Sequence, residues 1–205
     1  MLGAWNKTTT IRVVKVILFS LALLPLLLLV QRIVMGALGP DPAQVITESL
    51  GKAAFQLLLA TLLMTPLRKL TGWTGWVRCR RMLGLFAFFY AVLHVLAFLQ
   101  LILGWGDLWV TFTRRPYIIM GAAAFLLLVP LALTSTQKMM KRTGRMWKPL
   151  HRLVYLSAIF VWLHFLWQAR SDVLEMVVYG VVLLVLLVVR AYWFGASSLV
   201  PLRKA

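Results

Sequence analysis

Long apolar stretches separated by short polar segments fill this sequence from end to end. A helix needs about 20 mostly apolar residues to cross the hydrocarbon core of a bilayer, and six stretches reach that length. They span Val13–Met35, Gly51–Leu70, Met82–Gly104, Tyr117–Gln137, Pro149–Gln168 and Val173–Phe194. The pattern predicts an all-α integral membrane bundle of six transmembrane helices, with residues 1–205 forming a single transmembrane domain.

Prolines and glycines mark where these helices begin, bend and end. The segment Gly36–Gln44 is rich in turn-forming residues and separates the first two helices. Pro116 and Pro149 fall at or just before a helix start, where the missing N–H of proline costs little. Three further prolines lie within the predicted helices and are expected to kink or end them: Pro25, Pro66 and Pro130.

Composition and charge agree with a membrane bundle. Hydrophobic residues make up 62% of the 205 residues and charged residues 13%, so much of the apolar surface must face lipid. In a soluble protein, the formal net charge of +17 would suggest nucleic acid. Here the positions of the charges indicate membrane topology instead, and we expect no nucleic-acid partner.

The cations are concentrated in alternate connections of the predicted bundle. One side carries 17 cations and no acid: Lys7, Arg12, Lys15, Arg68, Lys69, Arg78, Arg80, Arg81, Lys138, Lys141, Arg142, Arg145, Lys148, Arg152, Arg190, Arg203 and Lys204. The other side carries five cations and five acids: Arg32, Lys52, Arg114, Arg115, Arg170, Asp41, Glu48, Asp107, Asp172 and Glu175. Since cytoplasmic loops are enriched in Lys and Arg, we expect both termini in the bacterial cytoplasm, with six crossings of the inner membrane between them.

The sequence lacks the motifs of most catalytic sites. Its single cysteine, Cys79, excludes an intrachain disulfide and an all-cysteine iron–sulfur site. Zinc-protease, Walker-type and GxGxxG motifs do not occur. The predicted connections are too short for a further domain, so we expect any flavin-binding or substrate-reducing domain on another polypeptide.

The three histidines all fall inside predicted helices, where ionisable groups usually mark function. His94 and His164 lie on two helices that run in the same direction. At ~1.5 Å per residue, His94 is ~18 Å and His164 ~22 Å from the start of its helix, so the two rings are level. Two level imidazoles are expected to hold one heme iron from opposite sides, which leaves no open position and favours electron transfer over oxygen binding.

His151 lies nearer the cationic side and has no obvious histidine partner. It precedes His164 by 13 residues, which places the two rings ~20 Å apart along a straight helix and ~140° apart around it. Counting back the same 13 residues from His94 leads to Arg81. Three roles stay open for His151: ligand of a second heme with a non-histidine partner, contact of a flavin or quinone, or cap of the helix start.

Several segments around the histidines resemble one known family. RCRRMLGL (Arg78–Leu85) precedes His94, LALTSTQKMMKRTGRMWKPLHRLVYL (Leu131–Leu156) contains His151, and VWLHFLW (Val161–Trp167) contains His164. With GALGPDP (Gly36–Pro42) and RRPY (Arg114–Tyr117), they resemble the heme-binding membrane subunit of the bacterial protein-methionine-sulfoxide reductase system, the MsrQ/YedZ family. This family lies within the ferric-reductase-like transmembrane group.

The resemblance implies a b-type cytochrome without a substrate-reducing site of its own. Electrons would come from quinol or a cytoplasmic flavin reductase and pass to a periplasmic molybdopterin enzyme that reduces methionine sulfoxide in oxidised envelope proteins. The implied cofactors are heme b, one or two per chain, and FMN. The heme-associated histidines map onto His94, His151 and His164. The ferric-reductase-like group typically has two histidines on each of two helices, whereas the third predicted helix here has one.

The arginines on the cationic side are candidates for binding the anionic groups of these cofactors, because arginine suits bidentate recognition of phosphate and carboxylate. The candidates are Arg78, Arg80, Arg81, Arg142, Arg145 and Arg152, of which we favour Arg78 and Arg81. The alternative is that these arginines serve topology alone.

Two other functions are consistent with the sequence. A quinol-linked cytochrome b subunit of a different periplasmic oxidoreductase would have the same histidines. A small carrier or assembly factor without a cofactor is the third alternative, although the helix cores lack the carboxylates that favour transport. The outer loops with Asp41, Glu48, Asp107, Arg114, Arg115 and Arg170 are where a periplasmic partner is expected to dock.

Overall fold

The regular elements of the described chain are all helical. The computed structural model describes residues 7–106, 110–111, 115–168 and 173–199. Its long helices are α1 (Lys7–Val34), α2 (Pro42–Thr71), α3 (Gly75–Ala97), α5 (Pro116–Leu133), α8 (Leu153–Gln168) and α9 (Val173–Leu199). The short ones are the π-helical η1 (Phe98–Leu103), α6 (Gln137–Thr143), the 3₁₀-helical η2 (Gly144–Met146) and α7 (Trp147–His151).

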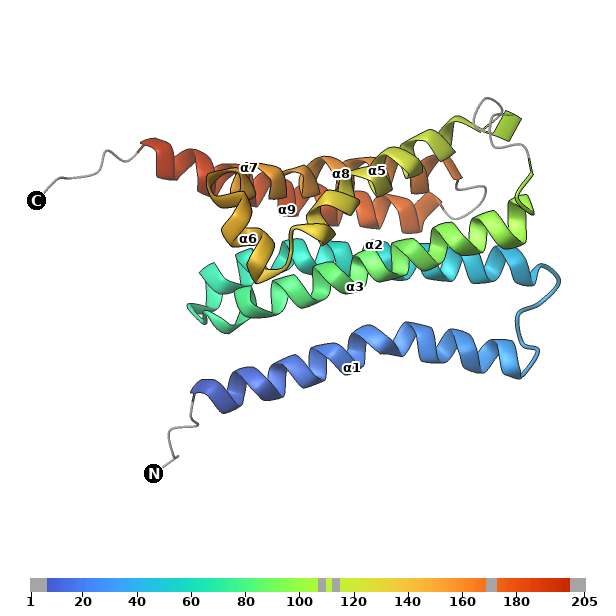
Figure 1. Cartoon of the computed structure of the whole chain (residues 1–205), viewed down its shortest axis with the longest axis horizontal. Helices are drawn as coiled ribbons and strands as arrows, with labels where there is room; N and C mark the ends of the chain where they lie inside the picture. Colours follow the sequence, from blue (N-terminus) through green and yellow to red (C-terminus); the bar gives the residue numbers. More distant parts are fainter. Residues whose placement is uncertain (1–6, 107–109, 112–114, 169–172, 200–205) are drawn as a thin grey trace, which may run out of the picture.

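The long helices run side by side along the longest axis of the molecule (Figure 1). α2 packs closely against α3, and α5 packs closely against α8. The largest group of buried apolar side chains joins five helices, with Leu62 from α2, Ala87 from α3, Leu128 from α5, Ala158 from α8 and Leu183 from α9. α1 lies to one side of this core, and most of its apolar side chains are exposed.

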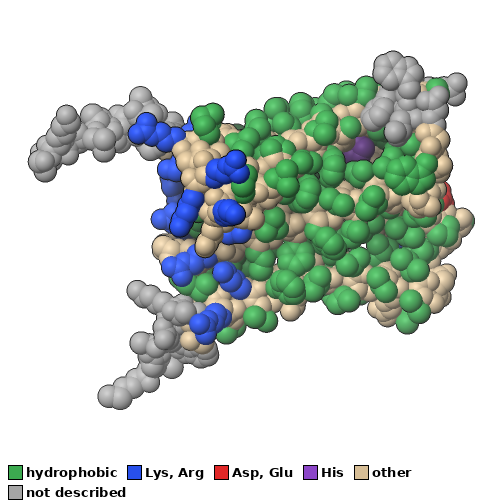
Figure 2. Space-filling model, in the orientation of Figure 1, with side chains coloured by type: hydrophobic (Ala, Val, Ile, Leu, Met, Phe, Trp, Pro, Cys, Tyr) green, Lys and Arg blue, Asp and Glu red, His purple; other side chains and the backbone are tan. Residues whose placement is uncertain are grey.

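The outer surface suits a lipid environment. Five described helices are long and apolar enough to cross a membrane. A sixth span results if the segments Gln137–His151 and Leu153–Gln168, which meet at an angle of 44°, are counted as one. Apolar side chains cover most of the face shown in Figure 2, while the cations gather at one end. Large apolar side chains such as Leu126, Leu174 and Leu184 are exposed, as expected for a surface that faces lipid.

Several helices extend beyond the apolar stretches that predicted them. α1 begins at Lys7 instead of Val13, and α9 continues to Leu199 instead of Phe194. α2 begins nine residues before Gly51, at Pro42, where Asp41 accepts a capping hydrogen bond from the Gln44 N–H (3.0 Å). Hydropathy marks the part of a helix that lies in hydrocarbon, whereas the helix itself continues through the interface.

The third predicted helix is shifted and changes type near its end. α3 begins at Gly75 instead of Met82 and is α-helical to Ala97. Residues Phe98–Leu103 continue it as a π-helix, which ends at Gly104 in a left-handed conformation. Pro66 lies inside α2, which continues to Thr71, so this proline does not end the helix.

The fourth and fifth predicted helices differ more from expectation. The predicted helix Tyr117–Gln137 ends at Leu133, and the hydroxyls of Thr134 and Ser135 bond back to backbone carbonyls of the last turn. The predicted helix Pro149–Gln168 is interrupted at Arg152, between α7 and α8. His151 and His164 therefore do not lie on one straight helix, and the ~140° between their rings predicted from regular geometry does not apply.

The described charges are segregated as predicted. The last turn of α2, the first turns of α3 and the segment from α6 to α7 carry the cations, and they lie at the end of the bundle where α1 begins and α9 ends (Figures 1 and 2). Asp41, Glu48 and Glu175 lie near the starts of α2 and α9, at the other end. Six predicted charges lie outside the described residues: Asp107, Arg114, Arg170, Asp172, Arg203 and Lys204.

A buried tyrosine joins α1 to the rest of the bundle. The Tyr90 hydroxyl donates to the carbonyl of Ala22 (2.8 Å) and accepts from the N–H of Leu26 (3.1 Å). In a regular helix these two backbone groups would pair with each other, and Pro25 lies between them. The hydroxyl is therefore inserted into the hydrogen-bond ladder of α1 beside its proline, a known cause of helix bending.

We expect Tyr90→Phe to destabilise the bundle by about 1–3 kcal/mol, because two buried backbone groups lose their shared partner while the ring is kept. Denaturant unfolding in detergent micelles measures this loss. Tyr192→Phe is the matched control, since Tyr192 is 72% exposed whereas Tyr90 is 0% exposed. Equal stability of the two variants would contradict the role given to the hydroxyl.

Candidate functional site

His94 on α3 and His164 on α8 meet inside the bundle, which confirms the prediction that they lie at one depth. The centres of their rings are 6.1 Å apart, and the ring planes are inclined by 80°. Both side chains are half-buried. Their helices are separated in the sequence by α5 and by the short helices that follow it, so only the tertiary fold brings the two imidazoles together.

Each imidazole is fixed by one hydrogen bond to a backbone carbonyl. Nδ1 of His94 lies 2.8 Å from the carbonyl oxygen of Thr47 on α2. Nδ1 of His164 lies 2.7 Å from the carbonyl oxygen of Tyr117 on α5. A carbonyl only accepts, so each Nδ1 carries the proton and each Nε2 has its lone pair available. This is the arrangement in which metal-binding histidines are usually held, because the second bond sets the tautomer and the ring orientation.

Two glycines make room for these rings. A Cβ atom on Gly51 would lie 2.9 Å from Nδ1 of His94, and one on Gly121 would lie 2.8 Å from Nδ1 of His164. Both distances are too short for a real contact. Gly51 comes four residues after Thr47, and Gly121 comes four residues after Tyr117. Because glycine has no side chain, each imidazole ring can lie directly against the helix backbone at this point.

These supporting residues recur with one spacing. In both hydrogen bonds the carbonyl precedes the histidine by 47 residues, and each glycine precedes its histidine by 43. The pair α2–α3 and the pair α5–α8 thus hold their histidines in the same way. Sequence analysis missed Gly51, Gly121 and the two carbonyls. The signal that was present is the common offset of 70 residues between the glycines and between the histidines.

The separation of the two rings fits an iron bound between them. Imidazole–metal bonds of about 2.0–2.1 Å on both sides of an ion place the ring centres ~6 Å apart, close to the distance found here. In the described part of the chain, no three His, Cys, Asp or Glu side chains gather as a metal site. The donor set is therefore two neutral nitrogens, which suits heme iron with two axial imidazoles.

Aromatic and charged groups lie around the pair. The Tyr117 ring is 5.7 Å from the His164 ring, and Phe165 packs edge-on against Phe55. Lys52 forms an ion pair with Glu175 (2.7 Å) that ties α2 to the start of α9. Both members of this ion pair are partly exposed, so the charges lie near the surface.

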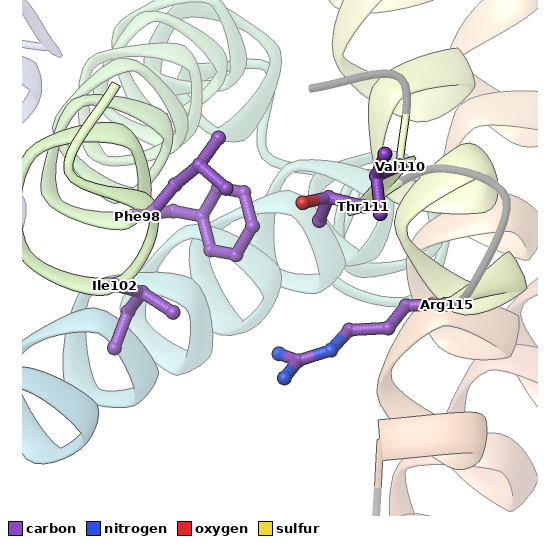
Figure 3. A pocket seen from close by; sticks show the side chains of 6 residues that line it. Phe98, Ile102, Val110, Thr111 and Arg115 are labelled. Carbon is purple, nitrogen blue, oxygen red and sulfur yellow. The ribbon is translucent and has the colours of Figure 1, made fainter. Parts of the chain in front are cut away.

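A small pocket opens beyond the histidine pair, towards the acidic end of the bundle. Its volume is about 200 Å³, and it is lined by Phe98, Ile102, Leu103, Val110, Thr111 and Arg115. Phe98 follows His94 by one helical turn, and Arg115 is two residues before Tyr117. Figure 3 shows the Arg115 side chain extending into the space in front of Phe98. Because ligand sites usually exceed about 300 Å³, this pocket suits one small group rather than a whole cofactor.

His151 lies apart from the pair, at the end of α7. Its ring stacks on Trp147 at 4.0 Å, and its Nδ1 lies 3.1 Å from the Trp147 carbonyl oxygen. The carbonyl of Leu131 is close to the ring, yet the buried Nε2 has no hydrogen-bond partner among the described residues. The structure therefore does not bring His151 to the other histidines and leaves one of its nitrogens available to a ligand.

The arginines proposed for cofactor anions differ in exposure. Arg78 and Arg81, the favoured candidates, are exposed on α3, as are Arg142, Arg145 and Arg152 elsewhere on the cationic end. Arg80, between the first two, is half-buried. A cofactor at the surface of this end would meet Arg78 and Arg81, whereas one inside the bundle would meet Arg80.

Comparison with known proteins matches this sequence to one family. The model of the family described as "Ferric reductase like transmembrane component" matches residues 50–162, the part that contains His94 and His151. Over 182 residues, 87% of this chain and 88% of the relative, the sequence is 44% identical to the "Protein-methionine-sulfoxide reductase heme-binding subunit MsrQ" of Rhodospirillum rubrum. Together with the apolar helices, these matches show a multi-pass membrane protein.

Proposed function

Because the chain belongs to the ferric-reductase-like transmembrane family, and within it to the MsrQ heme-binding subunits, we propose that it is the electron-transfer cytochrome of a protein-methionine-sulfoxide reductase system. The observation that carries the proposal is the pair His94 and His164, with ring centres 6.1 Å apart and Nδ1 of each ring held by a backbone carbonyl. These two residues would bind one heme b through their Nε2 atoms.

His94 and His164 would hold the heme, which would supply one-electron transfer; with both histidines bound to it, no position would remain for oxygen or substrate. The protein's own contribution is geometric and electrostatic. The Thr47 and Tyr117 carbonyls fix each Nε2 in place and make it a better donor, since a hydrogen bond at Nδ1 increases the basicity of the ring. Gly51 and Gly121 allow the close approach on which both hydrogen bonds depend.

The proposed direction of electron transfer follows from the expected topology. With the cationic end in the cytoplasm, both termini would be cytoplasmic. The histidine pair would then lie in the outer half of the inner membrane, because its carbonyl partners Thr47 and Tyr117 are near the starts of α2 and α5. Electrons would enter from quinol or a cytoplasmic flavin reductase and leave to a periplasmic molybdopterin enzyme that reduces methionine sulfoxide. The pocket with Arg115 lies at this outer end, where we place the contact with the periplasmic enzyme.

His151 is proposed as the contact of a second cofactor on the cytoplasmic side, either a second heme or FMN. Its unpartnered Nε2 and the stacked Trp147 ring support this role. Arg78 and Arg81 are proposed to bind the anionic groups of a cofactor at the cytoplasmic surface, where both are exposed.

The electron-transfer function is tested in proteoliposomes that contain the reduced protein. We expect the purified periplasmic reductase together with methionine sulfoxide to reoxidise the heme, followed by the decay of its reduced absorption bands. Reductase without methionine sulfoxide is the control. Because it has no substrate to reduce, it should reoxidise the heme only to the extent of a single partial turnover. If the complete mixture reoxidises the heme no faster than buffer, the assignment to this reductase is wrong.

The ligand pair is tested by absorption spectroscopy of histidine variants. We expect His94→Ala and His164→Ala each to abolish the six-coordinate low-spin spectrum, because one axial nitrogen is lost. His151→Ala serves as the comparison and should keep that spectrum. A double variant His94→Ala/His164→Ala with an unchanged Soret band per polypeptide would show that the iron is bound elsewhere.

The supporting glycines give an independent test of the same site. Gly51→Ala and Gly121→Ala should each weaken heme binding about 10–100-fold, as expected when an outer-shell partner of a ligating histidine is lost. Hemin titration of the heme-depleted protein measures the affinity. Gly84→Ala on α3 is the matched control, since its Cβ would meet Thr61 at an ordinary 3.6 Å. Equal affinity in all three variants would argue against close packing of the rings on these glycines.

A further inference from the structure

A buried arginine in the cytoplasmic half of the bundle has no anionic partner. Arg190 on α9 is 4% exposed. Its guanidinium donates to the Tyr155 hydroxyl on α8, and to the Thr65 hydroxyl and the Leu62 carbonyl on α2. All three acceptors are neutral, and Nε has no partner within the described residues. A buried charge is costly unless an opposite charge lies beside it.

No described carboxylate can neutralise this charge. Asp41 and Glu48 lie at the start of α2, and Glu175 lies at the start of α9 and pairs with Lys52. Arg190 is 15 residues beyond Glu175, about 22 Å along the helix. A second cation, the half-buried Arg80 in the first turns of α3, lies at the same cationic end of the bundle. Arg190 is thus a buried cation with no described carboxylate beside it, and an anion from outside the chain would supply the missing partner.

His151 belongs to the same region. Tyr155, whose hydroxyl accepts from Arg190, follows His151 by four residues, so His151 lies close along the chain to a contact of Arg190. Nε2 of His151 and Nε of Arg190 are the two buried side-chain nitrogens without a hydrogen-bond partner among the described residues. The Trp147 ring stacks on His151 and forms a flat aromatic surface beside it.

We infer that Arg190 and Arg80 bind the oxyanion group of a flat cofactor that lies against His151 in the cytoplasmic half of the membrane. The oxyanion is a carboxylate if this cofactor is a second porphyrin and a phosphate if it is a flavin mononucleotide. This inference rests on the proposed electron-transfer function and deepens it, because it gives the second cofactor a charged anchor on α9 and α3. It assigns the interior arginines to this cofactor, separately from the exposed Arg78 and Arg81.

The test compares charged probes with neutral analogues that lack the oxyanion. The purified full-length protein, with heme at the His94–His164 site, is titrated with hemin and hemin dimethyl ester, and separately with FMN and riboflavin. In the wild type we expect the charged member of one pair to bind at least about tenfold more tightly than its neutral analogue. The pair that shows this preference identifies the source of the oxyanion.

Variants then show whether the arginines cause the preference. In Arg190→Gln the preference for the charged probe should fall to within about twofold. Arg190→Lys should restore part of the preference, because lysine keeps the positive charge but lacks the bidentate fork of arginine. Arg68→Gln is the matched control, since Arg68 is exposed at the same end of the bundle, and it should retain the full preference. Arg80→Gln should also reduce the preference, and it keeps the test decisive if Arg190→Gln fails to fold.

The inference is overturned if neither pair shows a preference in the wild type, or if the preference survives in both Arg190→Gln and Arg80→Gln. A purely structural role of Arg190 would lower the stability of Arg190→Gln without changing the preference. Failure of the proposed function would be recognised separately, since the wild-type protein would then lack the spectrum of the His94–His164 heme.

Discussion

The hydrogen bond between each imidazole Nδ1 and a helix carbonyl is the interaction on which the histidine site depends. An unsupported histidine in a membrane bundle can rotate and present either nitrogen, and two such residues would seldom present their Nε2 atoms at the separation that one ion requires. The carbonyls of Thr47 and Tyr117 remove that freedom in the same way on both sides. Each bond needs a helix surface without a Cβ atom, and Gly51 and Gly121 provide it. The packing of α2 on α3 and of α5 on α8 is thus part of the site itself.

Much of this architecture follows from the sequence. Apolar stretches located the long helices, and counting charges between them identified a cationic and an acidic end, which the described residues confirm. Depth along two co-oriented helices was enough to pair His94 with His164. These predictions succeeded because the bilayer imposes strong constraints: a fixed thickness, a high cost for charge, and regular helices with a known rise per residue.

What the sequence concealed has equally physical causes. The Thr47 and Tyr117 carbonyls carry no side-chain signal, since any residue offers a backbone oxygen. The interruption at Arg152 was missed because the residues on either side are apolar enough to continue one helix. Arg190 had been counted as one of 17 topology-determining cations, because a count of charges does not show which of them are buried. Burial, local breaks and backbone partners are properties of the tertiary fold.

The Tyr90 hydroxyl in the ladder of α1 has a consequence for how the chain is assembled. α1 leaves the ribosome and enters the membrane before α3 has been synthesised, so the hydroxyl cannot yet stand between Ala22 and Leu26. During that interval the two backbone groups can satisfy each other, and the first helix is free to adopt a more regular course beside Pro25. Its final bend would then be acquired after insertion, when docking of a later helix exchanges one backbone bond for two bonds to a phenol.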